Sequence, residues 1–299
     1  MAAHVLSFDQ ISEADAALVG SKGLRLAQLA QAGLPVLNGF CVTTAAYRAY
    51  LAAIGLAQAD DSEGGIVATV TPDVAAWRAV STQGQLPAEV ADVIRTAYTE
   101  LDSPTVAVRS SATLEDSLDA SFAGQYDTFL NVSGSDAVLD RVRACWAGLW
   151  SERALAYLRE QGLDPRQAAM GVVVQCQANA HAAGVLFTLN PVTGNEEEMV
   201  IEAAWGLGEA VVSGRVTPDR YVVNARRRQV VTRDISNQSV VLVADSNGGT
   251  YERPLPEHQR DQAVLNDAQL MELTDLGYRV QAIYGYPQDI EWALVEDGR

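Results

Sequence analysis

The hydrophobic pattern of the chain changes near residue 170, and this change constrains the fold more than any other feature. Before that point, apolar residues recur mainly at helical spacing, as they do in 137–162. After it, short apolar runs of strand length follow one another, and the last of them is "QDIEWALVED". We therefore predict an α+β fold with a helix-rich lobe of residues 1–170 and a strand-rich lobe of residues 171–299.

Two helices of the first lobe are predicted in detail. One begins with Ser21 as its N-cap and ends before Gly33, because a hydroxyl residue and a glycine are the usual start and stop signals. The other is a single amphipathic helix over 137–162. Its Trp146 and Trp150 are expected in the core, because so large an apolar ring is usually buried.

The charge of the chain argues against two classes of partner. The 299 residues include 21 lysines and arginines against 38 acidic residues, which gives a formal net charge of −17. Such a field repels nucleic acid and anionic membrane surfaces. No apolar run has the length of a signal peptide or a membrane span. An anionic substrate must therefore be held by local hydrogen-bond donors.

Cysteine and histidine usage narrows the chemistry. Cys41, Cys145 and Cys176 are widely spaced and form no CxxC pair, which argues against a disulfide scaffold and a zinc site and fits a reducing cytoplasm. The three histidines lie in no order that is typical of a nucleophilic triad. We expect no covalent catalysis by this chain.

Two basic residues are candidates for binding phosphate. Lys22 lies at a helix start, where free N–H groups and the helix dipole favour an anion; the alternative is an exposed lysine beside a cap. Arg109 ends the apolar run "TVAVRS", so its guanidinium is expected at the C-terminal edge of a strand, where ligands commonly bind. Its alternative is an ion pair with an acidic residue of the segment that follows, which holds Glu115, Asp116 and Asp119.

A glycine-containing turn follows Arg109. Gly124 and Gln125 could direct backbone N–H groups at a phosphate, and the hydroxyl of Thr128 comes close behind. The alternative is a plain turn.

Further candidates belong to the second lobe or to its start. The polar stretch at Gln175 and Gln177 lies between two apolar strands and would suit a hinge that contacts adenine, or else an ordinary hairpin loop. Glu209 follows two glycines closely and could bind ribose, or else be a first-turn glutamate of a helix.

An acidic pair ends the strand pattern. Alternation places Asp289 and Glu291 on one face of a strand, with Ile290 and Trp292 on the other. Carboxylates beside a phosphate site would hold Mg²⁺ through oxygen ligands; the alternative is two acids on a solvent-facing strand.

Five segments together resemble the N-terminal nucleotide-binding domain of the phosphoenolpyruvate synthase and pyruvate phosphate dikinase family, which also includes rifampicin phosphotransferases and phenylphosphate synthases. The order and spacing of the segments match over almost the whole chain. They are "GSKGLRLAQLAQAGLPV", "VAVRSSATLEDSLDASFAGQYDTFLNV", "GVLFTLNPVTG", "AAWGLGEAVVSGRVTPDRYVV" and "QDIEWAL". Within the family, "SFAGQYDTFLNV" and "CWAGLWSERALAYL" are more similar to the antibiotic phosphotransferase branch than to the dikinases.

The resemblance implies an ATP-grasp-like fold with ATP between two α+β lobes, and it gives each candidate a role. Lys22 and Arg109 would bind and activate phosphates, and Glu291 would ligate Mg²⁺. The remaining roles are the phosphate-covering loop for Gly124, Gln125 and Thr128, adenine binding for Gln175 and Gln177, and ribose binding for Glu209. Phosphoryl transfer needs positioning and charge neutralisation more than a protein nucleophile, which agrees with the scarcity of histidine.

The resemblance also implies further parts. The family continues from its "DIEW" strand into a segment resembling "QSRP", whereas this sequence ends at Arg299. Members of the family also carry a phosphohistidine domain and an acceptor-binding domain, which we expect in a parent chain or a partner subunit. The implied reaction splits ATP into AMP and phosphate and passes a phosphoryl group to a small molecule. The alternatives are a subunit of a split, phenylphosphate-synthase-like enzyme, an ATP-dependent carboxylate–amine ligase, and a non-catalytic ATP sensor.

Overall fold

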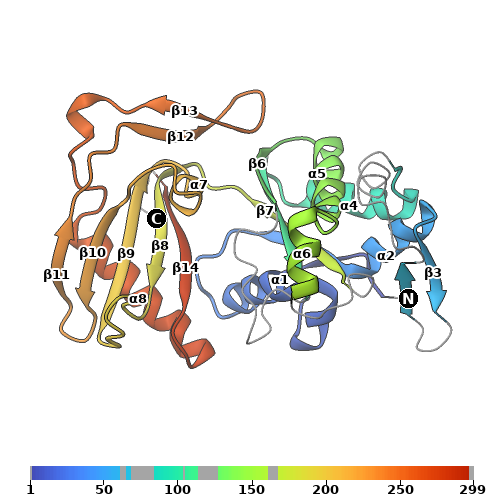
Figure 1. The fold of residues 1–299 in the computed structure, drawn as a ribbon, viewed down its shortest axis with the longest axis horizontal. Helices are drawn as coiled ribbons and strands as arrows, with labels where there is room; N and C mark the ends of the chain where they lie inside the picture. The colour runs from blue at the N-terminus through green and yellow to red at the C-terminus, as the bar shows by residue number, and fades with distance from the viewer. Residues whose placement is uncertain are drawn as a thin grey trace. The chain divides into compact units, whose positions relative to one another are not determined.

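The chain forms two compact units, residues 1–177 and 178–299, in the computed structural model shown in Figure 1. The structure describes residues 2–60, 65–68, 84–103, 105–113, 127–160 and 168–295. Both units combine helices with antiparallel sheet, so the predicted α+β class is confirmed. The division follows Gln177 rather than residue 170, because the strand that begins at Met170 pairs with strands of the first unit.

The first unit is built on a five-stranded sheet in the order β1-β2-β7-β5-β6. Its neighbouring strands pair antiparallel. The strands are β1 (Val5–Ser7), β2 (Gly39–Val42), β5 (Val106–Ala112), β6 (Thr128–Val132) and β7 (Met170–Cys176). A separate hairpin pairs β3 (Ala57–Asp60) with β4 (Gly65–Ala68).

Helices cover both faces of this sheet. α1 (Ala16–Gln31) packs on one face through a small cluster that includes Val19, Cys41 and Val173. The larger core lies on the other face. It is formed with α2 (Thr44–Ala53), α4 (Ala88–Glu100), α5 (Ser135–Gly148) and α6 (Glu152–Glu160).

The single long helix predicted over 137–162 is wrong, because the chain breaks between α5 and α6. The N–H groups of Leu149, Trp150 and Ser151 bond to carbonyls three residues back, which tightens and ends α5. Ser151 then starts α6, because its hydroxyl accepts from Ala154 N at 3.2 Å. Among the described helices, none is long and apolar enough to cross a bilayer.

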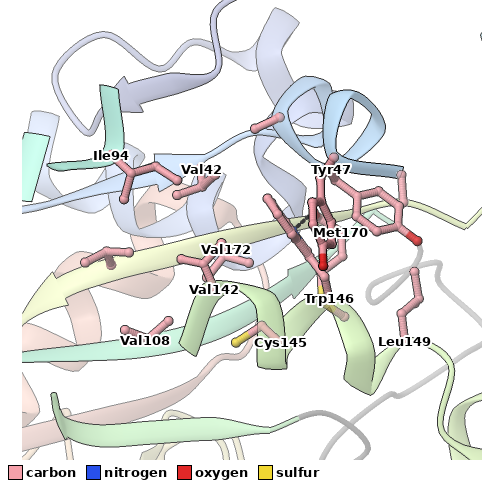
Figure 2. Packing of buried hydrophobic residues seen from close by; sticks show 14 of the residues in the cluster. Val42, Tyr47, Ile94, Val108, Val142, Cys145, Trp146, Leu149, Met170 and Val172 are labelled. Atoms are coloured by element: carbon pink, nitrogen blue, oxygen red, sulfur yellow. Dashed lines mark hydrogen bonds between the residues drawn. The ribbon is translucent and has the colours of Figure 1, made fainter. Parts of the chain in front are cut away.

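The two tryptophans of this region are buried, as predicted. Trp146 stacks on Tyr50 with ring centroids 5.3 Å apart, and its indole N–H donates to Met170 O at 3.1 Å. Figure 2 shows Trp146 beside Met170 and Tyr47 within this core. The indole N–H of Trp150 donates to the hydroxyl of Tyr47 at 3.0 Å. Each polar ring atom is therefore satisfied where the rings are buried.

The second unit has a five-stranded sheet in the order β11-β10-β9-β8-β14, one face of which is covered by a helix. The helix, α8 (Asp267–Tyr284), begins in a capping box of Asn266 and Gln269 and approaches the sheet at Gly277. The strands are β8 (Ala180–Phe187), β9 (Glu198–Trp205), β10 (Asp219–Asn224), β11 (Gln229–Asp234) and β14 (Asp289–Val295). The unit also contains the short helix α7 (Glu209–Val212) and a hairpin of β12 (Val240–Ala244) and β13 (Thr250–Pro254).

A buried carboxylate joins the segments of the second unit. Asp219 is fully buried at the start of β10 and accepts four hydrogen bonds. Its Oδ1 accepts from Ser236 N at 3.0 Å and from Gln238 Nε2 at 3.2 Å. Its Oδ2 accepts from the Tyr221 hydroxyl at 2.8 Å and from Val264 N at 2.9 Å. One carboxylate thus ties two separate stretches of chain, at 236–238 and at 264, to β10.

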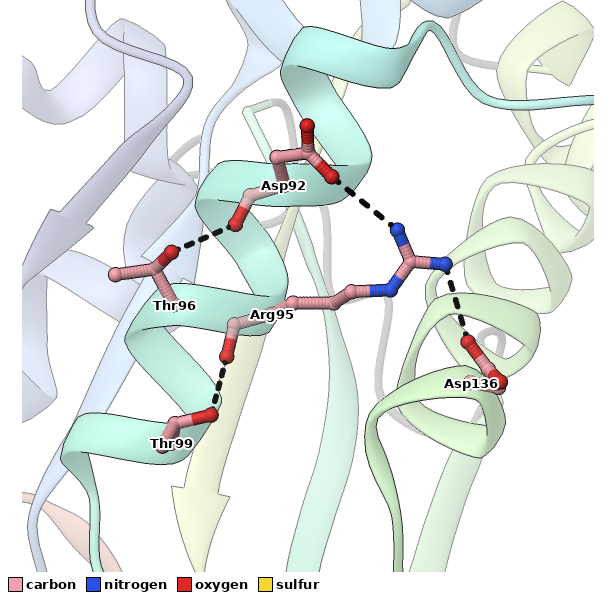
Figure 3. A network of polar contacts seen from close by, with 5 residues as sticks. All are labelled: Asp92, Arg95, Thr96, Thr99 and Asp136. Carbon is pink, nitrogen blue, oxygen red and sulfur yellow. Dashed lines mark hydrogen bonds and ion pairs between the residues drawn. The ribbon is translucent and has the colours of Figure 1, made fainter.

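Replacing Asp219 tests this role. Asp219→Ala leaves several buried donors without an acceptor, so we expect a loss of at least ~3 kcal/mol in the free energy of unfolding. The control is Asp136→Ala, which removes an exposed carboxylate that accepts from Arg95 at 3.1 Å in the surface network of Figure 3. Its expected cost is below ~1 kcal/mol. Hydrogen exchange is measured on the β10 amides of both variants, and only Asp219→Ala should lower their protection. Equal protection in the two variants would contradict the role of Asp219.

Candidate functional site

The backbone at Gly20 positions Lys22. Gly20 has φ 71° and ψ 171°, which interrupts α1 and divides it into two helical segments. A Cβ on Gly20 would lie 2.2 Å from Ser111 O, so only glycine fits this close approach to β5. The expectation of Ser21 as N-cap is therefore wrong by one residue: Gly20 holds the non-helical position and Ser21 starts the second segment. Lys22 lies in the first turn of that segment, close to a helix start as the sequence predicted.

The hydroxyl of Ser111 joins α1 to β5. Ser111 is fully buried, donates to Val19 O at 2.7 Å and accepts from Gly23 N at 3.1 Å. One side chain thereby satisfies a carbonyl and an N–H group on either side of the interruption. Beside it, the ammonium group of Lys22 donates to Ser110 O at 3.1 Å. This places the Lys22 charge over β5, next to Arg109.

Arg109 lies in the middle of β5 and not at its edge, so this expectation is wrong. The strand continues through Ala112, because Ser110 pairs with Val172 and Ser111 with Gly171 of β7. Residues two apart in a strand share a face, so Arg109 is on the face of Ser111 that packs on α1. Its side chain is half-buried there. The predicted alternative, an ion pair with a residue of 115–119, falls outside the described residues.

Thr128 completes a cluster with Lys22 and Arg109. It begins β6 and is the direct cross-strand partner of Arg109, so the two side chains share one face. The carbonyl of Asp127 accepts from the Ser110 hydroxyl at 3.2 Å, which fixes the entry to β6. Gly124 and Gln125 lie outside the described residues. The structure therefore brings Lys22, Arg109 and Thr128 together on one face of the sheet.

The thiols near this cluster are poor nucleophiles. Burial raises the pKa of Cys145 to about 12, although a hydrogen bond from Ser110 opposes that shift. Burial likewise raises the pKa of Cys41 to about 12. Because the thiolate is the reactive form, both side chains are inert at neutral pH. The cluster offers positive charge and hydrogen-bond donors.

Gln177 fastens the end of the first unit to β6. The β5–β6 register shifts between Val106 and Val108, and Asn131, with φ 53°, lies in the resulting bulge. The Asn131 N–H donates to Oε1 of Gln177, while Gln177 N donates to Thr105 O at 3.1 Å. The bulge therefore uses the side-chain oxygen that an adenine contact would need.

Gln175 belongs to β7, and its Nε2 donates to Leu37 O at 3.1 Å. The predicted alternative of an ordinary hairpin is wrong here, because β7 and β8 pair in different sheets. The stretch that holds both glutamines connects the two units.

Glu209 begins the one-turn helix α7 of the second unit. Gly206, with φ 79°, precedes it, and a Cβ there would lie 2.4 Å from Leu242 O. The backbone before Glu209 is thus tight, as expected. The carboxylate is partly exposed and lies 3.8 Å from the guanidinium of Arg215.

Asp289 and Glu291 are exposed on one face of β14, and Ile290 and Trp292 pack against the core from the other, as predicted. Partial desolvation raises the pKa of the Asp289 carboxyl. Within the described residues, no group of three or more histidine, cysteine or acidic side chains is placed to hold a metal ion.

The register of the sheet places a further carboxylate, Glu202, on the face that carries Glu291, and the sequence patterns did not predict it. Glu291 is opposite Val185, and Val185 is opposite Glu202, so the two glutamates share a face across three strands. The alternation of side chains in β9 predicts which face of the sheet Glu202 is on. That Glu202 lies in line with Glu291 follows only from the order and register of the strands.

Comparison with protein families matches residues 16–299 to the pyruvate phosphate dikinase AMP/ATP-binding domain. The chain belongs to this family. A rifampicin phosphotransferase of Streptomyces sviceus is 42% identical over 98% of this chain and 34% of its own length. A probable phosphoenolpyruvate synthase of Pyrococcus abyssi is 37% identical over 97% of this chain and 41% of its own length. The chain thus spans less than half the length of these relatives of the dikinase domain family.

Gly20 gives a test of how this dikinase-family domain holds Lys22. Gly20→Ala forces a Cβ into Ser111 O and into a backbone region that is essentially confined to glycine, so we expect a loss of about 3 kcal/mol in unfolding free energy. Gly33→Ala is the matched control, because Gly33 also has φ 71° but a Cβ there meets nothing within 4 Å. It should cost about 1–2 kcal/mol. Chemical denaturation measures both, and equal losses would show that the Ser111 contact is unimportant.

Proposed function

We propose that this chain is the ATP-binding module of a dikinase-type phosphotransferase with an ATP-grasp-like fold. The observation that carries the proposal is the cluster of Lys22, Arg109 and Thr128 on one face of the first unit's sheet. The family to which the chain belongs is described as AMP/ATP-binding, which supports a nucleotide as the ligand. In a chain of net charge −17, these donors supply a local positive site for phosphates.

In this proposal, the first unit grips the phosphates. Arg109 offers a planar, bidentate donor, and Lys22 adds a point charge held by Ser110 O. Thr128 adds a hydroxyl, and the loop with Gly124 and Gln125 adds backbone N–H groups. Phosphoryl transfer requires positioning and neutralisation of developing charge, and these are the groups that supply it.

The second unit contributes acceptors. Glu209 accepts hydrogen bonds from ribose hydroxyls, and Glu291 binds Mg²⁺, with Asp289 on the same face of β14. Mg²⁺ is usually held by one or two carboxylates together with substrate phosphates, so a site of this size suits it. Bound Mg²⁺ would neutralise phosphate charge. Gln175 and Gln177 remain the proposed adenine segment, which we assign to backbone groups because both side chains have structural partners.

The complete reaction splits ATP into AMP and phosphate and hands a phosphoryl group to a phosphohistidine domain and then to a small-molecule acceptor. Those domains belong to the parent chain or to a partner subunit. The higher identity to rifampicin phosphotransferases, 42% against 36–38% for phosphoenolpyruvate synthases, favours an antibiotic-type acceptor. A split, phenylphosphate-synthase-like enzyme would use the same ATP site.

The nucleotide product distinguishes this function from its alternatives. Calorimetric titration of the chain with Mg·ATP should show saturable binding at one site. Turnover in the complete enzyme should release AMP. Release of ADP would instead support a carboxylate–amine ligase, and binding without turnover by the complete protein would support a sensor.

The two basic residues should contribute unequally. We expect Arg109→Ala to weaken ATP binding ~100-fold and Lys22→Ala ~10-fold, because a bidentate guanidinium is harder to replace than a point charge. Arg226→Ala is the control, since Arg226 is exposed and pairs with Glu197 at 3.0 Å on the surface. Calorimetric affinities give the comparison, and unchanged binding in the Arg109 variant would refute its role.

Glu291→Gln should remove the metal dependence of binding. The wild-type chain is expected to bind ATP at least ~10-fold more tightly with Mg²⁺ than with a chelator, and the variant should show one affinity in both conditions, because an amide is a poor ligand for Mg²⁺. Glu272→Gln on the exposed side of α8 is the control. If Glu291→Gln keeps the full effect of Mg²⁺ on ATP affinity, Glu291 is not the metal ligand.

A further inference from the structure

The chain reverses direction immediately after α7 and returns Arg215 to the start of that helix. Gly214, with φ 67°, ends the helical turn. Arg215 N then donates to Ala210 O at 3.0 Å, so the backbone of Arg215 lies against the first turn. Its guanidinium Nη2 consequently lies 3.8 Å from Oε1 of Glu209.

The same guanidinium also meets the β12–β13 hairpin. Nη1 of Arg215 lies 3.8 Å from Oε1 of Glu252 on β13. Glu252 is the cross-strand partner of Leu242, whose carbonyl accepts from Leu207 N at 3.0 Å just before α7. The hairpin and α7 are therefore fixed to each other by backbone bonds, and Arg215 is placed between two carboxylates.

This arrangement affects the orientation of the Glu209 carboxylate more than the stability of the fold. All three side chains are partly exposed, with 47% of Arg215, 33% of Glu209 and 51% of Glu252 accessible. Ion pairs of this kind add little to the free energy of folding. Without the guanidinium, however, two carboxylates would face each other and repel, and Glu209 would turn away from Glu252. The cation attracts Oε1 of Glu209 across 3.8 Å, so the second oxygen is the one that can accept from a ligand.

We propose that Arg215 is a positioning residue of the sugar subsite, which sets the Glu209 carboxylate for the hydroxyl pair of a nucleotide ribose. This inference rests on the proposed function, in which Glu209 binds ribose. A guanidinium on one side of a carboxylate favours the rotamers that turn the other oxygen away from it, and a pair of neighbouring hydroxyls can donate to that oxygen. The β12–β13 hairpin contributes through Glu252, which anchors the far side of the guanidinium.

The test compares ATP with 2′-deoxy-ATP, because only the ribose contact distinguishes them. Calorimetry on the 299-residue chain should show that Arg215→Ala weakens ATP binding ~5-fold, weakens binding of 2′-deoxy-ATP less because that nucleotide keeps only the 3′-hydroxyl, and so removes most of the preference for ribose. Arg215→Lys keeps a cation and should retain part of that preference. Arg226→Ala, which removes another surface arginine that pairs with a glutamate, should leave it intact.

The outcomes separate this inference from the function on which it rests. If Arg215→Ala weakens both nucleotides equally, or changes neither, Arg215 does not position the sugar contact. If Glu209→Gln leaves the preference for ribose unchanged, or the wild type has none, the assignment of Glu209 itself is wrong and the inference falls with it. Thermal unfolding of each variant must match the wild type, and a lowered midpoint for Arg215→Ala would assign it a structural role instead.

Discussion

The contact of Gly20 with Ser111 is the constraint on which the first unit's candidate site depends. Because Gly20 carries no Cβ, α1 approaches β5 closely enough for the Ser111 hydroxyl to bond on both sides of the helix interruption. That contact fixes the direction in which the second segment of α1 leaves the sheet. Lys22 then reaches Ser110 O, and its charge joins that of Arg109 on one face.

The second unit is organised by a different kind of contact. The buried Asp219 carboxylate holds β10 to the segments at 236–238 and 264, while the tight backbone at Gly206 sets the start of α7. A buried charge is tolerated there because four donors satisfy it. The side chains with proposed ligand roles, Glu209 and Glu291, lie outside this network and remain accessible.

Local patterns in the sequence predicted the α+β class, the burial of Trp146 and the alternation of β14, because each depends on neighbours along the chain. The local patterns gave wrong predictions where a segment distant in the sequence determines the structure. β7 extends β5 beyond Arg109, and the β6 bulge occupies the side chain of Gln177. Ser151 restarts a helix that periodicity alone would continue, and the alignment of Glu202 with Glu291 depends on a register that no single strand encodes.

The candidate residues of the two units carry opposite charges, Lys22 and Arg109 in the first and Glu209 and Glu291 in the second. In the first, Lys22 donates to a carbonyl of β5 and Arg109 is half-buried within that strand, so both cations are held against the sheet. In the second, the carboxylates face outward, and the guanidinium of Arg215 lies 3.8 Å from the carboxylate of Glu209. Where 38 acidic residues outnumber 21 basic ones, a local positive site depends on cations that are held in place, and the backbone geometry around Gly20 places the first of them, Lys22.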